Sequence, residues 1–238
     1  MLTRSRKVLY QYMENQSKTY YEFVIHISVV TPSIRPEGLK IIQESLAKQT
    51  FKNWEWLVEI GVPEQGYSLN RDYNKLLKRA KGELIVSWQD FLKAPPEALQ
   101  KFWNAYQANP NTFFTAPVGK VLKWSDEPKY DWRINPESEM DWMKWEIDFG
   151  SAPLKCLQAI GGFDEWLDEK TWTFDAVNVG FRADLAGYKF KHLPENKAIA
   201  LDHDKIMEHP WREKNYHPEF HNQRLDEFRR GLRIDYLN

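Results

Sequence analysis

The chain contains 238 residues and carries a formal net charge of −1. That length suits one large α/β domain better than two small ones, and the charge excludes a global basic field of the kind that recruits nucleic acid or anionic membranes. The only cysteine, Cys156, cannot form an internal disulfide, which is typical of a reducing compartment. No apolar run approaches the ~20 residues of a membrane span, and the N-terminus lacks the apolar core of a signal peptide. We therefore expect a cytoplasmic protein with no membrane span and no nucleic-acid partner.

Strands and helices alternate along the chain from residue 27 onward, after a polar, tyrosine-rich extension at 1–22 whose β-prone stretches favour a hairpin. The predicted strands cover 27–30, 54–60, 82–88, 113–116 and 198–201. Helical apolar stripes follow at 39–46, 73–80, 99–106 and 220–232. This alternation favours one domain over 1–238, with a mostly parallel sheet covered on both faces and a C-terminal tail and helix at 205–238.

Two of these strands end at polar residues that suit a ligand site. The run Ile27–Val30 stops at Thr31-Pro32-Ser33, and the run Gly82–Trp88 stops at Gln89-Asp90. In an open α/β sheet, ligands bind beyond the carboxyl ends of the strands. A lone carboxylate such as Asp90 is therefore placed for chemistry.

Four sequence words, in their order and spacing, resemble the nucleotide-sugar glycosyltransferases of the GT-A fold, family-2 type. They are VVTPSIRPEGL, SLAKQTFKNWEWLVEIG, AKGELIVSWQD and AIGGFDE, and the resemblance covers roughly 27–204. It implies a GT-A (Rossmann-like) α/β fold. It also implies an inverting, metal-assisted transfer of a sugar from a nucleotide-diphosphate donor to a glycan or other hydroxyl acceptor, of the hexosyltransferase type.

The resemblance assigns donor binding to the ends of the first two strands. The loop Thr31, Pro32, Ser33 and Arg35 would lie against the nucleotide, although an ordinary strand-to-helix turn is the alternative. Glu59 matches the first acid of the family's Asp-Asp-Gly motif. Ile60 stands where that motif has its second acid. A carboxylate accepts the imide N–H of uracil, which makes a UDP-sugar the favoured donor.

Gln89 and Asp90 stand where the family places its metal-binding Asp-x-Asp word. A divalent cation offsets the diphosphate charge, and hard ions such as Mg²⁺ or Mn²⁺ choose oxygen ligands. His203, which follows the strand 198–201, resembles the family's closing histidine and is the second expected ligand. Trp88 and Gln89 replace acids common in the family, so a solvated Asp90 that caps a turn is the alternative.

Two further stretches of the sequence, residues 120–145 and 145–148, point to the acceptor side of the site. The segment from Lys120 to Trp145 loses all periodicity and reads as a long functional loop or a disordered insert. Trp145 and Asp148 fall where related enzymes line the donor-sugar and acceptor pocket, and a core position is the alternative for Trp145. At least one of the four tryptophans in this segment is expected to offer a stacking face to a sugar.

The catalytic base is assigned through the word Thr173–Arg182, which resembles the family's Glu-Asp-x-Asp-Leu-Gly-x-Arg helix start. Aligned on Gly180 and Arg182, Asp175 takes the Glu position, whereas Ala176 replaces the usual aspartate base. Asp175 is thus the local candidate to take the proton of the acceptor hydroxyl, with a helix N-cap as the alternative.

Two other function classes remain open. Acidic residues are missing from three motifs of the family, which leaves open a non-catalytic GT-A-like domain that binds a sugar nucleotide or glycan. A nucleotidyltransferase would need a glycine-rich, basic loop after the first strand, and Thr31–Arg35 contains no glycine.

Overall fold

The computed structural model describes residues 24–62, 68–171, 174–202 and 217–237. The strands are β1 (Ile27–Ser33), β2 (Trp54–Ile60), β3 (Leu84–Trp88), β4 (Leu92–Lys93), β5 (Thr112–Thr115), β6 (Val118–Val121), β7 (Phe149–Pro153), β8 (Lys189–His192) and β9 (Ala198–Leu201). The α-helices are α2 (Leu39–Leu46), α3 (Leu69–Arg79), α4 (Ala98–Ala108), α5 (Leu154–Ala159), α6 (Trp166–Lys170), α7 (Asp175–Leu185) and α9 (Pro218–Arg229). Short 3₁₀ turns are η1 (Pro36–Gly38), η3 (Trp132–Ile134) and η4 (Trp142–Lys144).

The main sheet has six strands in the order β2-β1-β3-β7-β5-β8, and a second sheet has three in the order β4-β9-β6. β1 pairs in parallel with both β2 and β3, and β5 pairs in parallel with β8. β7 runs antiparallel to its neighbours β3 and β5. The expected fold class, a mixed and mostly parallel α/β sheet with helices on both faces, is confirmed.

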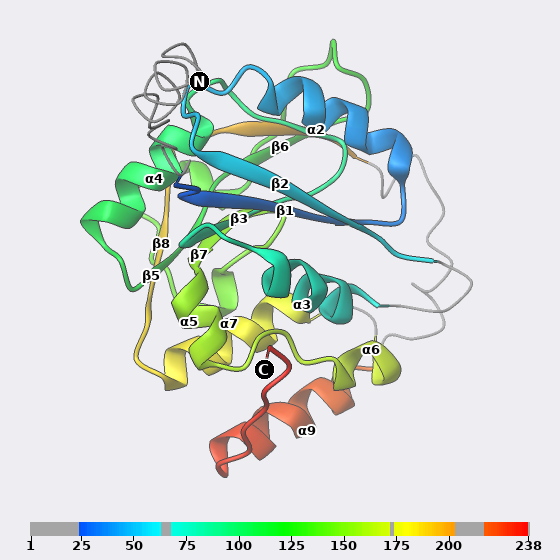
Figure 1. Ribbon diagram of the computed structural model, residues 1–238, viewed down its shortest axis with the longest axis vertical. Helices are drawn as coiled ribbons and strands as arrows, with labels where there is room; N and C mark the ends of the chain where they lie inside the picture. The colour runs from blue at the N-terminus through cyan, green and yellow to red at the C-terminus, as the bar shows by residue number, and fades with distance from the viewer. Residues whose placement is uncertain (1–23, 63–67, 172–173, 203–216, 238) are drawn as a thin grey trace, which may run out of the picture.

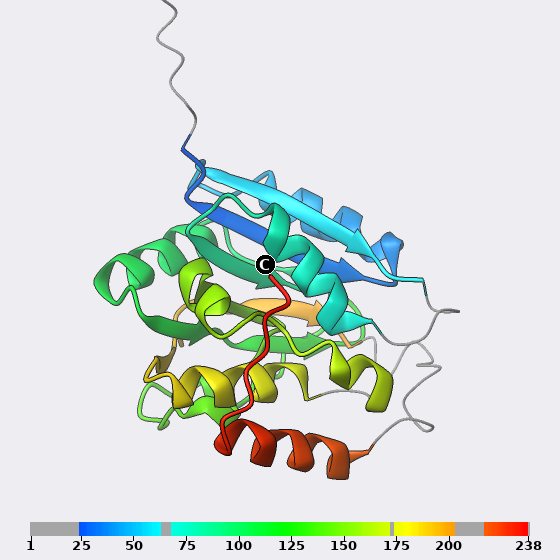
Figure 2. The same cartoon turned by 60° about the horizontal axis from the view of Figure 1, so that its bottom comes forward.

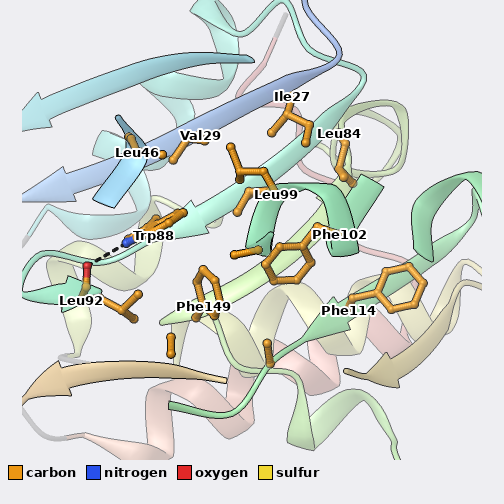
Figure 3. Close-up of a cluster of buried hydrophobic side chains, with 14 of the residues drawn as sticks. Ile27, Val29, Leu46, Leu84, Trp88, Leu92, Leu99, Phe102, Phe114 and Phe149 are labelled. Carbon is orange, nitrogen blue, oxygen red and sulfur yellow. Dashed lines mark hydrogen bonds between the residues drawn. The ribbon is translucent and has the colours of Figure 1, made fainter. Parts of the chain in front are cut away.

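Alternation along the buried strands sends side chains into two apolar layers. Val29 of β1 and Val86 of β3 face α2 and α4, as Figure 3 shows for the cluster around Trp88, Phe102 and Phe149. The opposite face of the sheet packs against α3, α5 and α7. Figure 1 shows these two groups of helices on either side of the sheet. Each fully buried Leu, Ile or Phe contributes about 1.5–3 kcal/mol relative to an exposed one, so both layers hold the sheet in place.

The first strand is longer than its sequence predicts. β1 continues through Pro32 to Ser33, which lies opposite Ile60 of β2. Pairing with β3 stops earlier, at Val30 opposite Ser87. Beyond Val30 the strand is paired on one side only, and a proline without an N–H is tolerated there. The ligand-side loop is therefore held by β2 for three extra residues, Thr31 to Ser33.

The C-terminal segment crosses the outer face of the helical layer. α9 packs against α6 and α7, and Figure 2 shows the chain then running toward α3. Gly161 and Gly162 both have a φ of +79°, and the backbone of Ile234 approaches Gly161 so closely that a Cβ there would clash. This glycine pair, which could have faced a ligand, admits the C-terminal segment instead. None of the described helices is long and apolar enough to cross a membrane.

Candidate functional site

Polar side chains gather at the edge of the sheet where β1 and β3 end and β7 begins. The Thr31 hydroxyl donates to the Trp88 carbonyl at 2.8 Å, and the Ser33 hydroxyl donates to Asp90 Oδ2 at 2.6 Å. Because β7 is antiparallel to β3, its start lies at the same edge, and the Gln89 N–H donates to the Asp148 carbonyl at 3.1 Å. The structure thus brings Thr31, Ser33, Asp90 and Asp148 together, as the strand-end rule predicts.

Asp90 forms a buried ion pair with Arg35. Arg35 Nη2 donates to Asp90 Oδ1 at 2.7 Å, and Arg35 Nε donates to Oδ2 at 3.1 Å. The Asp90 side chain is 2% exposed and that of Arg35 is 17% exposed. This two-point contact is the strong geometry for a guanidinium and a carboxylate. Arg35 and Asp90 were both predicted at the site, but their pairing was not.

The described residues do not fit a divalent cation as they stand. Both Asp90 oxygens already accept hydrogen bonds, and the nearest partner is a positive charge rather than a second acid. Among the residues that the structure describes, no group of three His, Cys, Asp or Glu side chains could hold a metal ion. The second expected ligand, His203, lies outside the described residues. The role of a metal therefore stays a prediction from the sequence.

Glu59 lies near the end of β2, where Pro32 of β1 is its register partner. Its carboxylate accepts from Lys75 Nζ at 3.1 Å and lies 3.5 Å from Arg79 Nη2, both on α3. The acid is therefore neutralised by the helix that covers this face. Its contact with a base stays a prediction.

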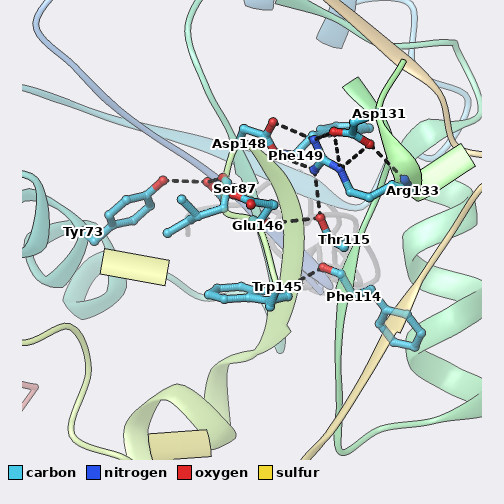
Figure 4. Close-up of polar contacts among 11 residues, drawn as sticks. Tyr73, Ser87, Phe114, Thr115, Asp131, Arg133, Trp145, Glu146, Asp148 and Phe149 are labelled. Carbon is cyan, nitrogen blue, oxygen red and sulfur yellow. Dashed lines mark hydrogen bonds and ion pairs between the residues drawn. The ribbon is translucent and has the colours of Figure 1, made fainter. Parts of the chain in front are cut away.

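A buried arginine organises the segment between β6 and β7. Arg133, in η3, is 3% exposed, and Figure 4 shows its guanidinium between Asp131, Asp148 and Thr115. Its Nη1 donates to Asp148 Oδ1 at 2.7 Å and to the Thr115 hydroxyl at 3.0 Å. Burial alone would lower the pKa of Arg133, but the charges of Asp148 and Asp131 raise it above its usual value. The segment expected to be a loop or a disordered insert is thus fixed to the ends of β5 and β7.

Trp145 belongs to the core and not to an open pocket, which corrects its predicted placement. It is 2% exposed, its indole N–H donates to the Phe114 carbonyl at 3.0 Å, and its ring meets Phe113 edge-on. A ring enclosed on this scale has no free face for a sugar. Trp124 and Trp132 of the same segment are 38% and 37% exposed. They are the tryptophans that could still offer a stacking face.

Asp175 is the first residue of α7 and is 6% exposed. Its Oδ1 accepts from the Asn70 side-chain amide at 2.6 Å, and the same amide donates to Asp168 at 2.8 Å. Asp168 also accepts from the backbone N–H groups of Asn70 and Arg71 at the start of α3. Burial, followed by the nearby charge of Asp175, raises the pKa of Asp168 to about 7.

Tyr73 lies buried next to this edge of the sheet. Its hydroxyl lies 2.7 Å from the Ser87 hydroxyl, and the Ser87 O–H donates to the Ile147 carbonyl. Burial raises the pKa of Tyr73, and the negative charges of Asp175, Asp148 and Asp90 raise it further. The charges of three acids from different parts of the chain therefore act on one buried hydroxyl. Asn70, Tyr73 and Asp168 were not predicted at the site, because nothing in the local sequence distinguishes them from other polar and aromatic residues of amphipathic helices.

A hollow of about 520 Å³ lies beside this edge, between β6 and the segment that follows it. Its lining includes Lys120, Lys129, Tyr130, Asp131 and Asp202. Asp131 is also a partner of Arg133, so the hollow adjoins the Arg133–Asp148 pair. Val118, Val121 and Leu122 add apolar surface to this lining, and a lining that combines charged groups, apolar side chains and an aromatic ring suits an amphipathic ligand such as a sugar.

Comparison with known proteins finds similar folds among solved structures. No protein-family model and no curated protein matches the chain. Among solved structures, S. aureus TarS 1–349 in complex with UDP-GlcNAc matches 84% of this chain and 64% of its own, with a TM-score of 0.60 and 16% identity. The chain has the GT-A fold. The UDP complex of the same TarS fragment matches 74% of this chain and 60% of its own, with a TM-score of 0.55 and 15% identity.

The chain spans less than two thirds of the length of these structures. A longer S. aureus TarS structure matches 74% of this chain but only 36% of its own, with a TM-score of 0.57 and 15% identity. At this identity the likeness establishes the fold. The activity has to be argued from the site.

Proposed function

We propose that the protein is an inverting glycosyltransferase that moves a hexosyl group from a nucleotide-diphosphate sugar, with a UDP-sugar as the favoured donor, to a hydroxyl of a glycan or another acceptor. The observation that carries the proposal is the gathering of Thr31, Ser33, Asp90 and Asp148 at the ligand-binding edge of a GT-A sheet. S. aureus TarS, a GT-A-like glycosyltransferase with a similar fold, has structures in complex with UDP and with UDP-GlcNAc.

The donor half of the proposed site is formed by β1, β2 and β3. Thr31, Pro32 and Ser33 would lie along the nucleotide, and Glu59 would accept the uracil imide N–H. Asp148, held in place by the two-point contact with Arg133, would accept hydroxyl groups of the donor sugar. Gln89 adds a neutral amide beside Asp90, so hydrogen bonding and not charge is its proposed contribution.

The proposed catalytic step needs one proton acceptor. The acceptor hydroxyl attacks the anomeric carbon, the bond from that carbon to the diphosphate oxygen breaks, and the hydroxyl proton passes to a carboxylate. Asp175 is the proposed base. The Asn70 amide holds one oxygen of its carboxylate at 2.6 Å, which fixes the orientation of the group. Asp168 is a positioning residue, because it holds both the side chain and the backbone of Asn70.

The acceptor is proposed to enter from the hollow beside β6. In this proposal Tyr130 offers a ring to one face of a sugar. Asp131 and Asp202 accept hydrogen bonds from the hydroxyl groups of that sugar. The mixed charge of the lining favours a polar, hydroxylated acceptor over a strongly anionic one.

Release of UDP from nucleotide sugars tests the proposal. Full-length protein is incubated with UDP-GlcNAc, UDP-glucose or UDP-galactose, and UDP is quantified with and without Mn²⁺ or Mg²⁺. Slow hydrolysis of at least one donor is expected, because water can replace the acceptor. Donor binding by calorimetry without UDP release from any donor, even with glycan acceptors present, would support a non-catalytic sugar-nucleotide binder.

That second candidate has a specific basis. Ile60, Gln89 and Ala176 stand where the resemblance places acids, so three acids of the family's pattern are absent. A binder would keep the Asp175–Asn70 contact for structural reasons, as a hydrogen bond across α3 and α7. In a binder, Asp175→Asn would leave donor affinity unchanged with no turnover to lose, whereas in the enzyme it would reduce turnover.

A further inference from the structure

The Asp90 carboxylate is occupied in a way that leaves no ordinary place for a cation. Oδ1 accepts from Arg35 Nη2 at 2.7 Å, and Oδ2 accepts from Arg35 Nε at 3.1 Å and from the Ser33 hydroxyl at 2.6 Å. A divalent ion bound to either oxygen would lie beside the positive guanidinium. The repulsion would oppose binding unless Arg35 first left a buried, two-point contact.

Both loops around the pair are shaped to hold it. The Arg35 backbone N–H donates to the Ser33 hydroxyl at 2.9 Å, which ties the arginine to the end of β1. Phe91, next to Asp90, has a φ of +59°, an uncommon conformation for a residue with a large side chain. A Cβ on Gly38 would lie 2.8 Å from the Phe91 ring and 2.9 Å from Asp90 Cβ. The two loops are thus in direct contact, and the ion pair is part of that packing.

Among the residues that the structure describes, no acceptor satisfies one of the donors of Arg35. Its Nη1 is buried and has no hydrogen-bond partner, whereas Nε and Nη2 are both used. A buried N–H without an acceptor is costly, so such a group marks a place where a ligand oxygen fits. Guanidinium groups match the oxygens of phosphates in geometry and charge. Diphosphate is the anionic part of the proposed donor.

We infer that Arg35 takes the charge-neutralising place of the divalent cation, so that the nucleotide diphosphate binds at this edge without metal, with Arg35 Nη1 donating to a phosphate oxygen and Asp90 positioning the guanidinium. The inference rests on the proposed function, and it replaces the cation expected from the resemblance. Residues 88 and 89 are neutral, so Asp90 is the only acid of its word, and Arg35 already balances it. As the bond to the anomeric carbon breaks, the guanidinium stabilises the charge that develops on the leaving diphosphate.

Titration calorimetry of UDP onto the full chain tests this directly. The protein is first freed of metal with a chelating resin, and the titration is run in EDTA and again in 5 mM MnCl₂ (about the level that saturates weak cation sites). The expected dissociation constants agree within about twofold. UDP binding that requires Mn²⁺, or that Mn²⁺ strengthens by tenfold or more, overturns the inference and leaves the proposed function intact.

A double variant locates the contact. Arg35→Gln alone would leave a buried, unpaired Asp90 and risks unfolding, so Arg35→Gln is combined with Asp90→Asn, which keeps the shapes and removes both charges. Circular dichroism confirms the fold. UDP affinity is expected to fall by about tenfold or more in both buffers, because a charge-assisted hydrogen bond is lost. Arg229→Gln, which removes an exposed guanidinium paired with Asp226 on α9, is the matched control and should bind normally.

Uridine separates a phosphate contact from a general defect. Because Arg35 is assigned to the diphosphate, the signal of uridine in ligand-observed NMR should be the same for the double variant and the wild type. Equal UDP affinity in the two proteins overturns the assignment of Arg35, and so does a parallel loss of uridine binding. Absence of UDP binding to the wild type in both buffers overturns the proposed function and the inference together.

Discussion

At the scale of single residues, the site depends on how a few buried acids are held. Asp175 and Asp168 share the amide of Asn70, yet their surroundings differ. Asp168 also accepts the backbone N–H groups of Asn70 and Arg71 at the start of α3, which ties it to that helix, whereas Asp175 is the first residue of α7. Asp168 is therefore assigned a positioning role, and Asp175 is the proposed base.

Asp175→Asn separates these roles. Asn keeps an oxygen that can accept from Asn70 but is not a base, so turnover is expected to fall about 10²–10⁴-fold while UDP affinity stays within about threefold. Initial rates of UDP release and calorimetry measure the two quantities. Asp184→Asn, an exposed position on the same helix, is the control and should retain its rate. Near-normal turnover in Asp175→Asn would leave Asp175 as a structural residue only.

Asp168 should make stability depend on pH. Its folded pKa of about 7 lies above the usual 3.8, so the folded state holds a proton that the unfolded state releases between about pH 4 and 7. Unfolding releases this proton, and stability therefore falls as pH rises through that window. Urea titrations at pH 5 and pH 8 give the free energy of unfolding at each pH. Asp168→Asn should reduce the fall in this free energy between the two pH values by on the order of 2 kcal/mol. An unchanged pH dependence would contradict the raised pKa.

At the scale of elements, the segment between β6 and β7 shows why composition alone misleads. It has no apolar periodicity, and periodicity is the main local signal of structure. One buried side chain, Arg133, ties the segment to the start of β7: it binds Asp131 two residues away and Asp148 fifteen residues away. The segment is therefore held by hydrogen bonds and charge, with Trp145 as its apolar anchor.

Arg133→Met tests that account. The change preserves much of the side-chain volume but leaves Asp148 without its partner, and we expect a loss of about 2 kcal/mol in the free energy of unfolding. The loss is smaller than for a fully enclosed pair, since Asp148 is 24% exposed. Urea unfolding gives the value. Arg229→Met, at an exposed ion pair, should change stability by less than about 0.5 kcal/mol, and equal effects at both positions would argue against Arg133 as the organising residue.

The C-terminal segment offers a second comparison between matched positions. Gly161 and Gly187 have φ values of +79° and +84°, so alanine is strained at both. Only at Gly161 does the added Cβ meet the Ile234 backbone, whereas at Gly187 it meets nothing within 4 Å. Gly187→Ala should cost about 1 kcal/mol and Gly161→Ala at least twice that. Faster proteolysis after residue 230 in Gly161→Ala alone would show that the segment has been displaced, while equal stability losses would mean that its packing contributes little.

At the scale of the whole molecule, the five predicted strands are present, but β4, β6, β7 and β8 lie outside them because these short strands carry little local signal. Strands such as Trp54–Ile60 and helices such as Pro218–Arg229 begin and end at local signals, and the sheet edge that collects Ser33 and Asp90 follows from a general rule of parallel sheets. The pairing of Arg35 with Asp90 could not be read this way. It joins residues 55 positions apart and depends on the direction of two side chains. The buried position of Trp145 was equally hidden, since the same residue type fills cores and stacks on sugars.

Ligand binding to one edge should stabilise the entire fold. A ligand present at 100 times its dissociation constant adds about 2.7 kcal/mol to the free energy of unfolding, which raises the melting temperature of a chain of this size by about 5–10 °C. UDP should produce such a shift and CDP a smaller one, because uracil offers an imide N–H to the Glu59 carboxylate whereas cytosine offers an acceptor at that position. Glu59→Gln should narrow the difference between the melting-temperature shifts caused by UDP and CDP, since the glutamine amide can donate to cytosine. Glu44→Gln, at an exposed acid on α2, should leave it unchanged. Thermal-shift titrations at equal concentrations of the two nucleotides measure all of these effects, and equal shifts for UDP and CDP in the wild type would mean that Glu59 does not contact the base.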